Sequence, residues 1–94
     1  MARRSGTLSA NGDSFTYVAP RQAGYCGVRL TIGGTWGGGT MTLYERGEDG
    51  TWRAVTDGAW TANTMKEFAP VFGASYKLTL TGATAPSLYY EFAD

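Results

Sequence analysis

The chain has few side chains that could carry out acid–base or metal chemistry. It contains no histidine, which excludes Ser-His-Asp and Cys-His catalytic sites and histidine-containing zinc sites. Two carboxylates could still act as an acid and base pair. However, expected positions in turns or on polar strand faces favour a solvated surface role for Glu45, Glu48, Asp49, Asp57, Glu67 and Glu91. We therefore predict that the protein is not an enzyme and holds no cofactor.

Two glycine-containing segments have features of ligand-binding loops. Asp49-Gly50 matches part of a calcium loop, but the other spaced oxygen ligands are missing and Asp-Gly also forms ordinary hairpin turns. The glycine-rich run 33–39 is followed by strand-like residues 40–43, whereas a phosphate loop requires a lysine and a helix. We predict no metal or phosphate site and interpret 33–39 as a structural or interaction loop that Trp36 pins.

The single cysteine, Cys26, cannot form an internal disulfide. Because no histidine or nearby lysine is present to favour its thiolate, we interpret it as a small buried apolar residue. A domain of 94 residues without a disulfide or a metal has only a thin core, so we expect it to gain stability by assembly.

Aromatic side chains are the main candidates for recognition. Trp36 and Trp60 lie in or near expected loops, where a ring can stack on a sugar or anchor a protein interface, although packing in the core is the favoured interpretation for each. Tyr89 alternates with apolar residues, so either Tyr89 or its apolar neighbours must face outward. The candidate interface or ligand-stacking residues are Arg3, Arg4, Trp36, Trp60 and Tyr89.

Charge and hydropathy argue against two classes of partner. Eight basic and eight acidic side chains cancel, and apart from Arg3 and Arg4 they are scattered, so we predict no nucleic-acid surface. No apolar stretch is long enough to cross a membrane, and the basic start is followed by polar residues, unlike a secretory signal.

Short strands must position these residues. Apolar and polar residues alternate with a period of two, which predicts strands at 28–32, 40–46, 76–81 and 88–92. Turn residues predict three hairpins, centred on Asn11-Gly12 within 7–18, on 48–50 before a strand at 51–55, and on 82–86. A further turn is expected at Asp57-Gly58 before 59–62, and a short strand at 66–69 that Pro70 ends or confines to an edge.

This pattern of about eight short strands, with a turn signal every 8 to 12 residues, predicts an all-β fold. We expect a single antiparallel β-sandwich or jelly-roll-like barrel that spans residues 1–94. Residues 1–6 are expected to form an N-terminal arm that is flexible or contacts a neighbouring subunit.

Three segments carry a resemblance to a known group of proteins. They are GTWGGGTMTL at 34–43, DGTW at 49–52 and LTGATAPSL at 80–88. From about Val28 to Phe92 the chain resembles small β-sandwich structural proteins of tailed-bacteriophage virions, namely head decoration (cement) or accessory proteins. The resemblance implies no catalysis and no cofactor. It also implies symmetric assembly, and we expect the partners to be the major capsid protein and copies of the chain itself, as a trimer or other small ring.

The function expected from these observations is that of a decoration protein on the capsid surface of a virion, made in the cytoplasm of the bacterial host. One alternative is a carbohydrate- or receptor-binding module in which Trp36, Trp60 and Tyr89 stack on a glycan. A second alternative places the same sandwich at the phage neck or tail as an adaptor.

Overall fold

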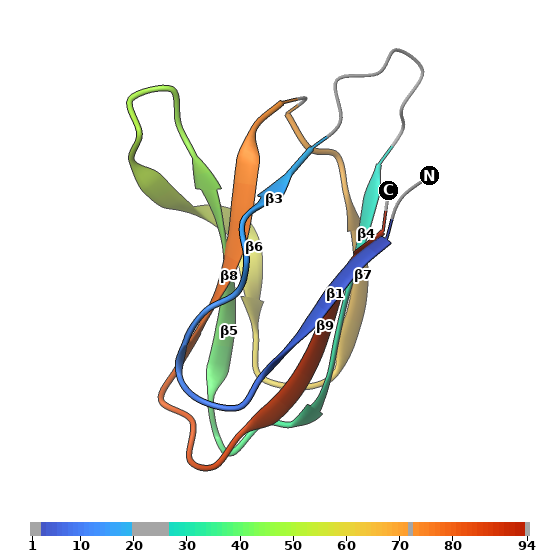
Figure 1. The fold of residues 1–94 in the computed structure, drawn as a ribbon, viewed down its shortest axis with the longest axis vertical. Coiled ribbons are helices and arrows are strands. Elements are labelled where there is room, and N and C mark those ends of the chain that lie inside the picture. Colours follow the sequence, from blue (N-terminus) through green and yellow to red (C-terminus); the bar gives the residue numbers. More distant parts are fainter. Residues whose placement is uncertain (1–2, 20–26, 72, 94) are drawn as a thin grey trace.

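The computed structural model describes residues 3–19, 27–71 and 73–93 and shows two antiparallel sheets that face each other (Figure 1). The four-stranded sheet has the order β1-β9-β4-β7, and the five-stranded sheet has the order β2-β8-β5-β6, with β3 also paired to β8. The strands are β1 Arg3–Leu8, β2 Gly12–Asp13, β3 Tyr17–Val18, β4 Val28–Thr35, β5 Thr40–Arg46, β6 Trp52–Trp60, β7 Thr64–Phe68, β8 Ser75–Thr81 and β9 Ser87–Ala93. The predicted all-β antiparallel sandwich is confirmed, with nine strands in the described residues.

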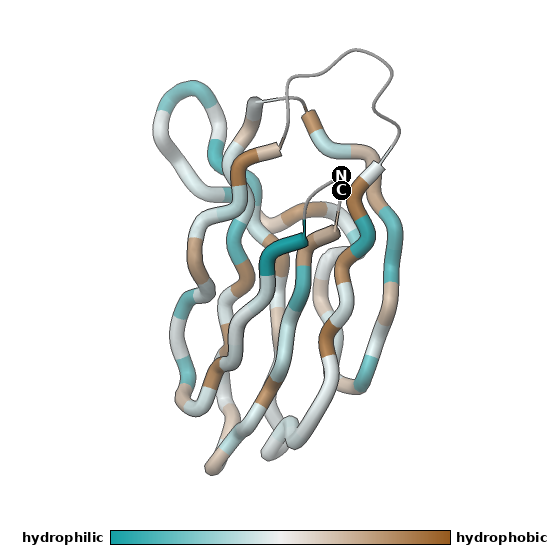
Figure 2. The backbone as a smooth tube through the Cα atoms, turned by 45° about the vertical axis from the view of Figure 1, so that its right-hand side comes forward, coloured by the Kyte–Doolittle hydropathy of each residue, from teal (hydrophilic) through white to brown (hydrophobic). Residues whose placement is uncertain are grey.

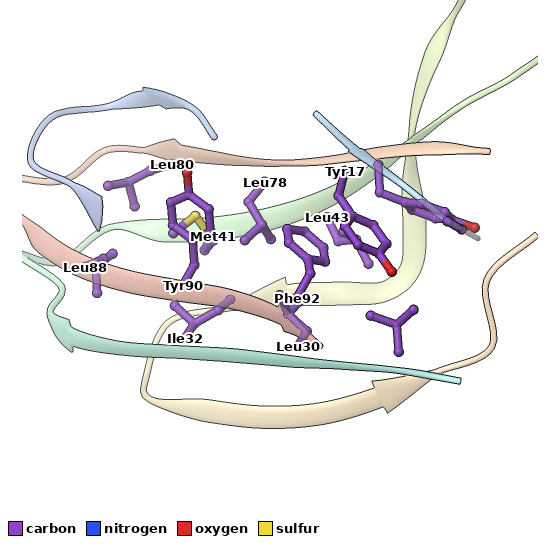
Figure 3. Close-up of a cluster of buried hydrophobic side chains, with 13 residues drawn as sticks. Tyr17, Leu30, Ile32, Met41, Leu43, Leu78, Leu80, Leu88, Tyr90 and Phe92 are labelled. Atoms are coloured by element: carbon purple, nitrogen blue, oxygen red, sulfur yellow. The ribbon is translucent and has the colours of Figure 1, made fainter. Parts of the chain in front are cut away.

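The core lies between the sheets and is made by alternate residues of the central strands. Figure 2 shows hydrophobic positions recurring between more hydrophilic ones along the strands, as expected where one face of each strand is buried. Figure 3 shows the side chains of both sheets meeting in this layer, where the Tyr17 and Phe92 rings stack with centroids 4.7 Å apart. The buried apolar residues are Tyr17, Ala19, Val28, Leu30, Ile32, Met41, Leu43, Tyr76, Leu78, Leu80, Leu88, Tyr90 and Phe92.

The hairpin predicted around Asn11-Gly12 is wrong. β1 pairs with β9 along its whole length, and β2 pairs with β8 in the other sheet, so residues 9–11 connect the two sheets. The Asn11 side chain does not form a tight turn; its amide donates to the Ala83 carbonyl at 3.0 Å and accepts from the Ala83 N–H at 2.9 Å. The segment predicted to form one hairpin therefore contributes β1 to the four-stranded sheet and β2 to the five-stranded sheet.

The hairpin predicted between 76–81 and 88–92 is also wrong, although both strands exist. β8 lies in the five-stranded sheet and β9 in the four-stranded sheet, so residues 82–86 cross between the layers. The physical reason is that both strands carry a strongly apolar face. Both faces are buried from opposite sides of the core, Leu78 from the five-stranded sheet and Leu88 from the four-stranded sheet, and the alternation along each strand does not specify which sheet it joins.

The hairpin between β5 and β6 is confirmed, but β6 continues further than predicted. The Asp57-Gly58 pair does not end the strand, since Ala54 and Ala59 both still pair with β5. Residues 55–58 lie opposite the single residue Leu43, which makes a large β-bulge in which Asp57 has a φ of 58°. The edge of the five-stranded sheet is therefore irregular at its centre.

The outermost strands of the four-stranded sheet are β1 and β7. Residues 3–6 of the predicted N-terminal arm form the first part of β1, and residues 1–2 lie outside the described part of the chain. Their contact with a neighbouring subunit stays a prediction. The short strand predicted before Pro70 is β7, which begins at Thr64 and is an edge strand, as a following proline requires.

Candidate interaction surface

The outer face of the four-stranded sheet carries two large exposed apolar side chains. Leu88, Tyr90 and Phe92 point into the core, so Tyr89 points outward and is 43% exposed. Met65 lies on the same face at the edge strand β7 and is 63% exposed. We call this surface the Tyr89 face; its outward residues include Arg3, Ser5, Thr7, Arg29, Thr31, Gly33, Met65, Glu67, Tyr89, Glu91 and Ala93.

A buried carboxylate lies at the centre of the Tyr89 face. Glu91 is only 8% exposed, although it is on the outer side of the sheet. Its Oε1 accepts a hydrogen bond from Arg3 Nη2 at 3.0 Å, and its Oε2 accepts one from the Tyr89 hydroxyl at 3.0 Å. Both carboxylate oxygens thus hold side chains that themselves remain accessible to a partner.

The charge state of Glu91 follows from these contacts. The hydrogen bond from Arg3 and then that from Tyr89 lower the pKa of Glu91, and both outweigh the burial that opposes ionisation. An ionised Glu91 accepts from both donors at once and fixes the positions of Arg3 and Tyr89. The sequence-based interpretation of Glu91 as a solvated surface carboxylate is therefore wrong, because Glu91 is buried and both of its carboxylate oxygens accept hydrogen bonds from side chains.

Arg4 does not share this face. It alternates with Arg3 along β1, lies opposite the buried Phe92, and places its guanidinium 4.4 Å from the centroid of the Phe15 ring. A cation over an aromatic face is a favourable contact, and here it covers one side of the core.

Trp36 and Trp60 lie at two other places. Trp36 packs partly buried at one end of the core and donates its indole N–H to Asn63 Oδ1 at 2.9 Å, and the same oxygen accepts the Gly34 N–H at 3.1 Å. Trp60 lies at the end of β6 opposite Met41 and packs against the core. Trp36, Trp60 and Tyr89 therefore do not form one stacking platform, whereas Arg3 and Tyr89 do lie together.

On the outer face of the five-stranded sheet, polar side chains contact one another and the Trp52 ring. Lys77 Nζ lies 4.7 Å from the centroid of the Trp52 ring and 3.0 Å from Asp13 Oδ2. The Thr79 hydroxyl donates to Asp13 Oδ1 at 2.7 Å, and this bond, followed by that from Lys77, lowers the pKa of Asp13. Sequence reasoning missed this group, although the alternation in 76–81 already places Lys77 and Thr79 on the outer side.

The remaining candidates for chemistry have structural partners. Asp49 accepts from Arg53 at 2.8 Å and from the Thr51 N–H at 3.0 Å; these bonds, the one from Arg53 first, lower the pKa of Asp49 to about 2. This is a turn-stabilising arrangement. The described residues contain no group of three or more possible metal ligands, and Cys26 lies outside them.

One buried tyrosine fastens the loop before β8. The Tyr76 hydroxyl donates to Glu45 Oε1 at 2.7 Å and accepts from the Val71 N–H at 2.9 Å. Burial, followed by the bond to Glu45, raises the pKa of Tyr76 to about 12, so this hydroxyl stays protonated and acts as a donor.

The Arg3–Glu91 contact makes stability depend on pH in a predictable direction. Because the folded state lowers the pKa of Glu91 below its ordinary value of 4.5, the stabilisation is complete above that value and is lost as the pH falls through the lower, folded pKa. We expect Arg3→Ala to have a lower Tm than the wild type at neutral pH, and this difference to shrink under acid. Thermal unfolding of both proteins from neutral to acid pH measures it, with Arg46→Ala as a control; a difference independent of pH would contradict the assignment.

Comparisons with known proteins identify no relative. No family model, no curated protein and no solved structure matches the chain. In the described part of the chain, no helix is long and apolar enough to cross a membrane.

Proposed function

We propose that this chain is a non-enzymatic structural protein of a tailed-phage virion that binds the outside of the head as a decoration protein. The observation that carries the proposal is the Tyr89 face, in which a buried Glu91 holds an exposed tyrosine and an exposed arginine in place. Tyrosine and arginine, together with tryptophan, are enriched among the residues that dominate the energetics of protein interfaces. The resemblance of 34–43, 49–52 and 80–88 to phage virion proteins supplies the setting.

A binding role suits this face better than catalysis does. Both Glu91 oxygens accept hydrogen bonds that lower its pKa, which makes its carboxylate a weaker base. Preorganised side chains lose little conformational entropy when a partner covers them, which favours affinity. The Tyr89 face therefore has the properties of a docking surface for another folded protein.

Assembly would supply the stability that a small core cannot. A single domain of this size buries a limited share of its surface, and binding to the folded state adds stability through mass action. Copies of the chain, as a trimer or other small ring at junctions between major capsid proteins, would bury additional area on each neighbour and so strengthen the shell.

Binding to capsids tests this proposal directly. We expect the purified protein to bind expanded phage heads at micromolar concentration and to raise the temperature at which they disrupt. Tyr89→Ala should weaken binding by about tenfold or more, because it removes the central aromatic contact. Tyr44→Ala is the matched control, since Tyr44 lies on the outer face of the other sheet. A wild-type protein that does not bind heads would refute the proposed function. Equal binding by the two variants would refute the assignment of the Tyr89 face as the binding surface.

A further inference from the structure

The sandwich has two open sides, where an edge strand of one sheet faces an edge strand of the other. Residues 14–16 cover one of these sides, next to β1. On the β1 side, residues 14–16 carry Phe15, whose ring lies 5.4 Å from that of Tyr90 and 6.0 Å from that of Phe92. Arg4 covers Phe15 from outside. This side is thus sealed by one large apolar side chain under a cation.

The other side, between β6 and β7, is closed differently. We call it the β6–β7 seam. No strand pairing links β6 to β7 within the part of the chain that the structure describes. A cavity of about 40 Å³ opens here, which is the room of about three water-sized spheres. Its lining residues are Leu30, Leu43, Val55, Thr56, Asp57, Gly58, Trp60, Lys66 and Phe68.

The chemistry of this cavity favours an apolar occupant. Its floor is made by Leu30 and Leu43, which are almost fully buried, and Trp60 and Phe68 contribute to its walls. A bound water needs two to four polar partners, which such a floor does not offer. A branched aliphatic side chain such as that of valine or leucine is apolar and small, and it suits this opening.

The backbone beside the cavity is ready to pair with an extended chain. Among the described residues, β7 pairs with β4 on one side only, so the N–H and C=O groups on its other side have no ladder partner there. β6 cannot supply that partner, because its bulge at 55–58 interrupts the strand beside the cavity. Lys66 lies on the inward side of β7, opposite Leu30, and brings a positive charge to the β7 side of the cavity, while Asp57 brings a negative charge to the β6 side.

We propose that the β6–β7 seam binds an extended segment of a partner polypeptide by strand addition to β7. The segment pairs with the free edge of β7 and inserts one branched aliphatic side chain into the cavity, as Phe15 fills the opposite side of the sandwich. An acidic residue two positions away on the same face of the segment meets Lys66. Main-chain bonds then provide affinity and the cavity provides selectivity. This site is separate from the Tyr89 face and does not depend on its role.

A short blocked peptide tests the seam without knowledge of the natural partner. The probe is acetyl-Thr-Thr-Leu-Thr-Glu-Thr-amide, which presents its leucine and its glutamate on one face when extended. In an NMR titration to millimolar concentration, we expect shifts in the backbone amides of 64–68 and in the Trp60 indole. The same peptide with alanine in place of leucine should bind about tenfold more weakly, because less apolar surface is buried.

Two variants of the protein locate the binding. Lys66→Leu removes the charge that meets the glutamate of the peptide and puts a branched apolar side chain where the lysine lines the cavity, so it should weaken binding of the leucine peptide by about tenfold. Glu67→Leu is the matched control on the outer side of the same strand and should leave binding unchanged. Absence of shifts at 64–68, equal affinity for the two peptides, or unchanged binding by Lys66→Leu would each overturn the proposal.

Discussion

Replacing Phe92 with alanine is expected to lower the free energy of unfolding by about 3–5 kcal/mol. Phe92 is fully buried at the centre of the core, and its ring stacks on Tyr17 and lies 6.0 Å from Phe15. These three rings come from β3, from β9 and from the segment between β2 and β3, so Phe92 joins segments from both layers. The loss therefore combines a lost transfer free energy with a cavity that distant segments cannot easily collapse.

Urea denaturation followed by fluorescence measures this loss. Phe92→Leu is the control, because it keeps most of the volume and should cost less than about 1.5 kcal/mol. Small domains have total stabilities of about 5–15 kcal/mol, so the alanine variant should unfold at a clearly lower urea concentration. A loss below about 1 kcal/mol for Phe92→Ala would mean that this core is not the tightly packed layer described above.

Local pattern was sufficient to predict which residues face the core. The alternation in 28–32, 40–46, 76–81 and 88–92 placed Val28, Leu43 and Leu78 inside, and all three are buried. It also limited Tyr89 to the face opposite Leu88, because neighbouring residues on a strand point to opposite sides. Such predictions need only the geometry of one strand.

Strand pairing could not be predicted in the same way, since it depends on partners far apart in the sequence. Arg3 and Glu91 are 88 positions apart, and only the pairing of β1 with β9 brings them together. Nothing in the sequence around Glu91 distinguishes it from a solvated carboxylate. The sequence therefore identified two residues of the candidate site, Arg3 and Tyr89, but not Glu91, which bonds to both of them.

Turn signals had the same limit. Asp-Gly occurs at 49–50 and again at 57–58, and it forms a hairpin turn at the first position and a bulge inside β6 at the second. The residue with positive φ is the glycine, Gly50, at the first position and the aspartate, Asp57, at the second. Which structure forms depends on whether the chain must reverse or merely bend along β5, and that is decided by the rest of the sheet.

Two neighbouring glycines of the glycine-rich segment also differ in their surroundings, which the sequence does not show. Gly37 and Gly38 are neighbours with positive φ values of 59° and 77°. A Cβ on Gly37 would lie 2.1 Å from the Thr84 carbonyl oxygen, a backbone atom that cannot rotate away, whereas a Cβ on Gly38 would meet no atom within 4 Å. Thr84 also donates its N–H to the Gly37 carbonyl at 2.9 Å, which ties the two loops together.

We therefore expect Gly37→Ala to lower the free energy of unfolding by about 2–5 kcal/mol, the sum of the left-handed backbone penalty and the overpacking penalty. Gly38→Ala carries only the backbone penalty, and its more restricted unfolded chain offsets part of it, so its loss should be about 1 kcal/mol. Urea denaturation of the two variants in parallel measures the difference. Equal losses would contradict the close approach of the 36–39 and 82–86 loops, on which the crossing of the chain from β8 to β9 depends.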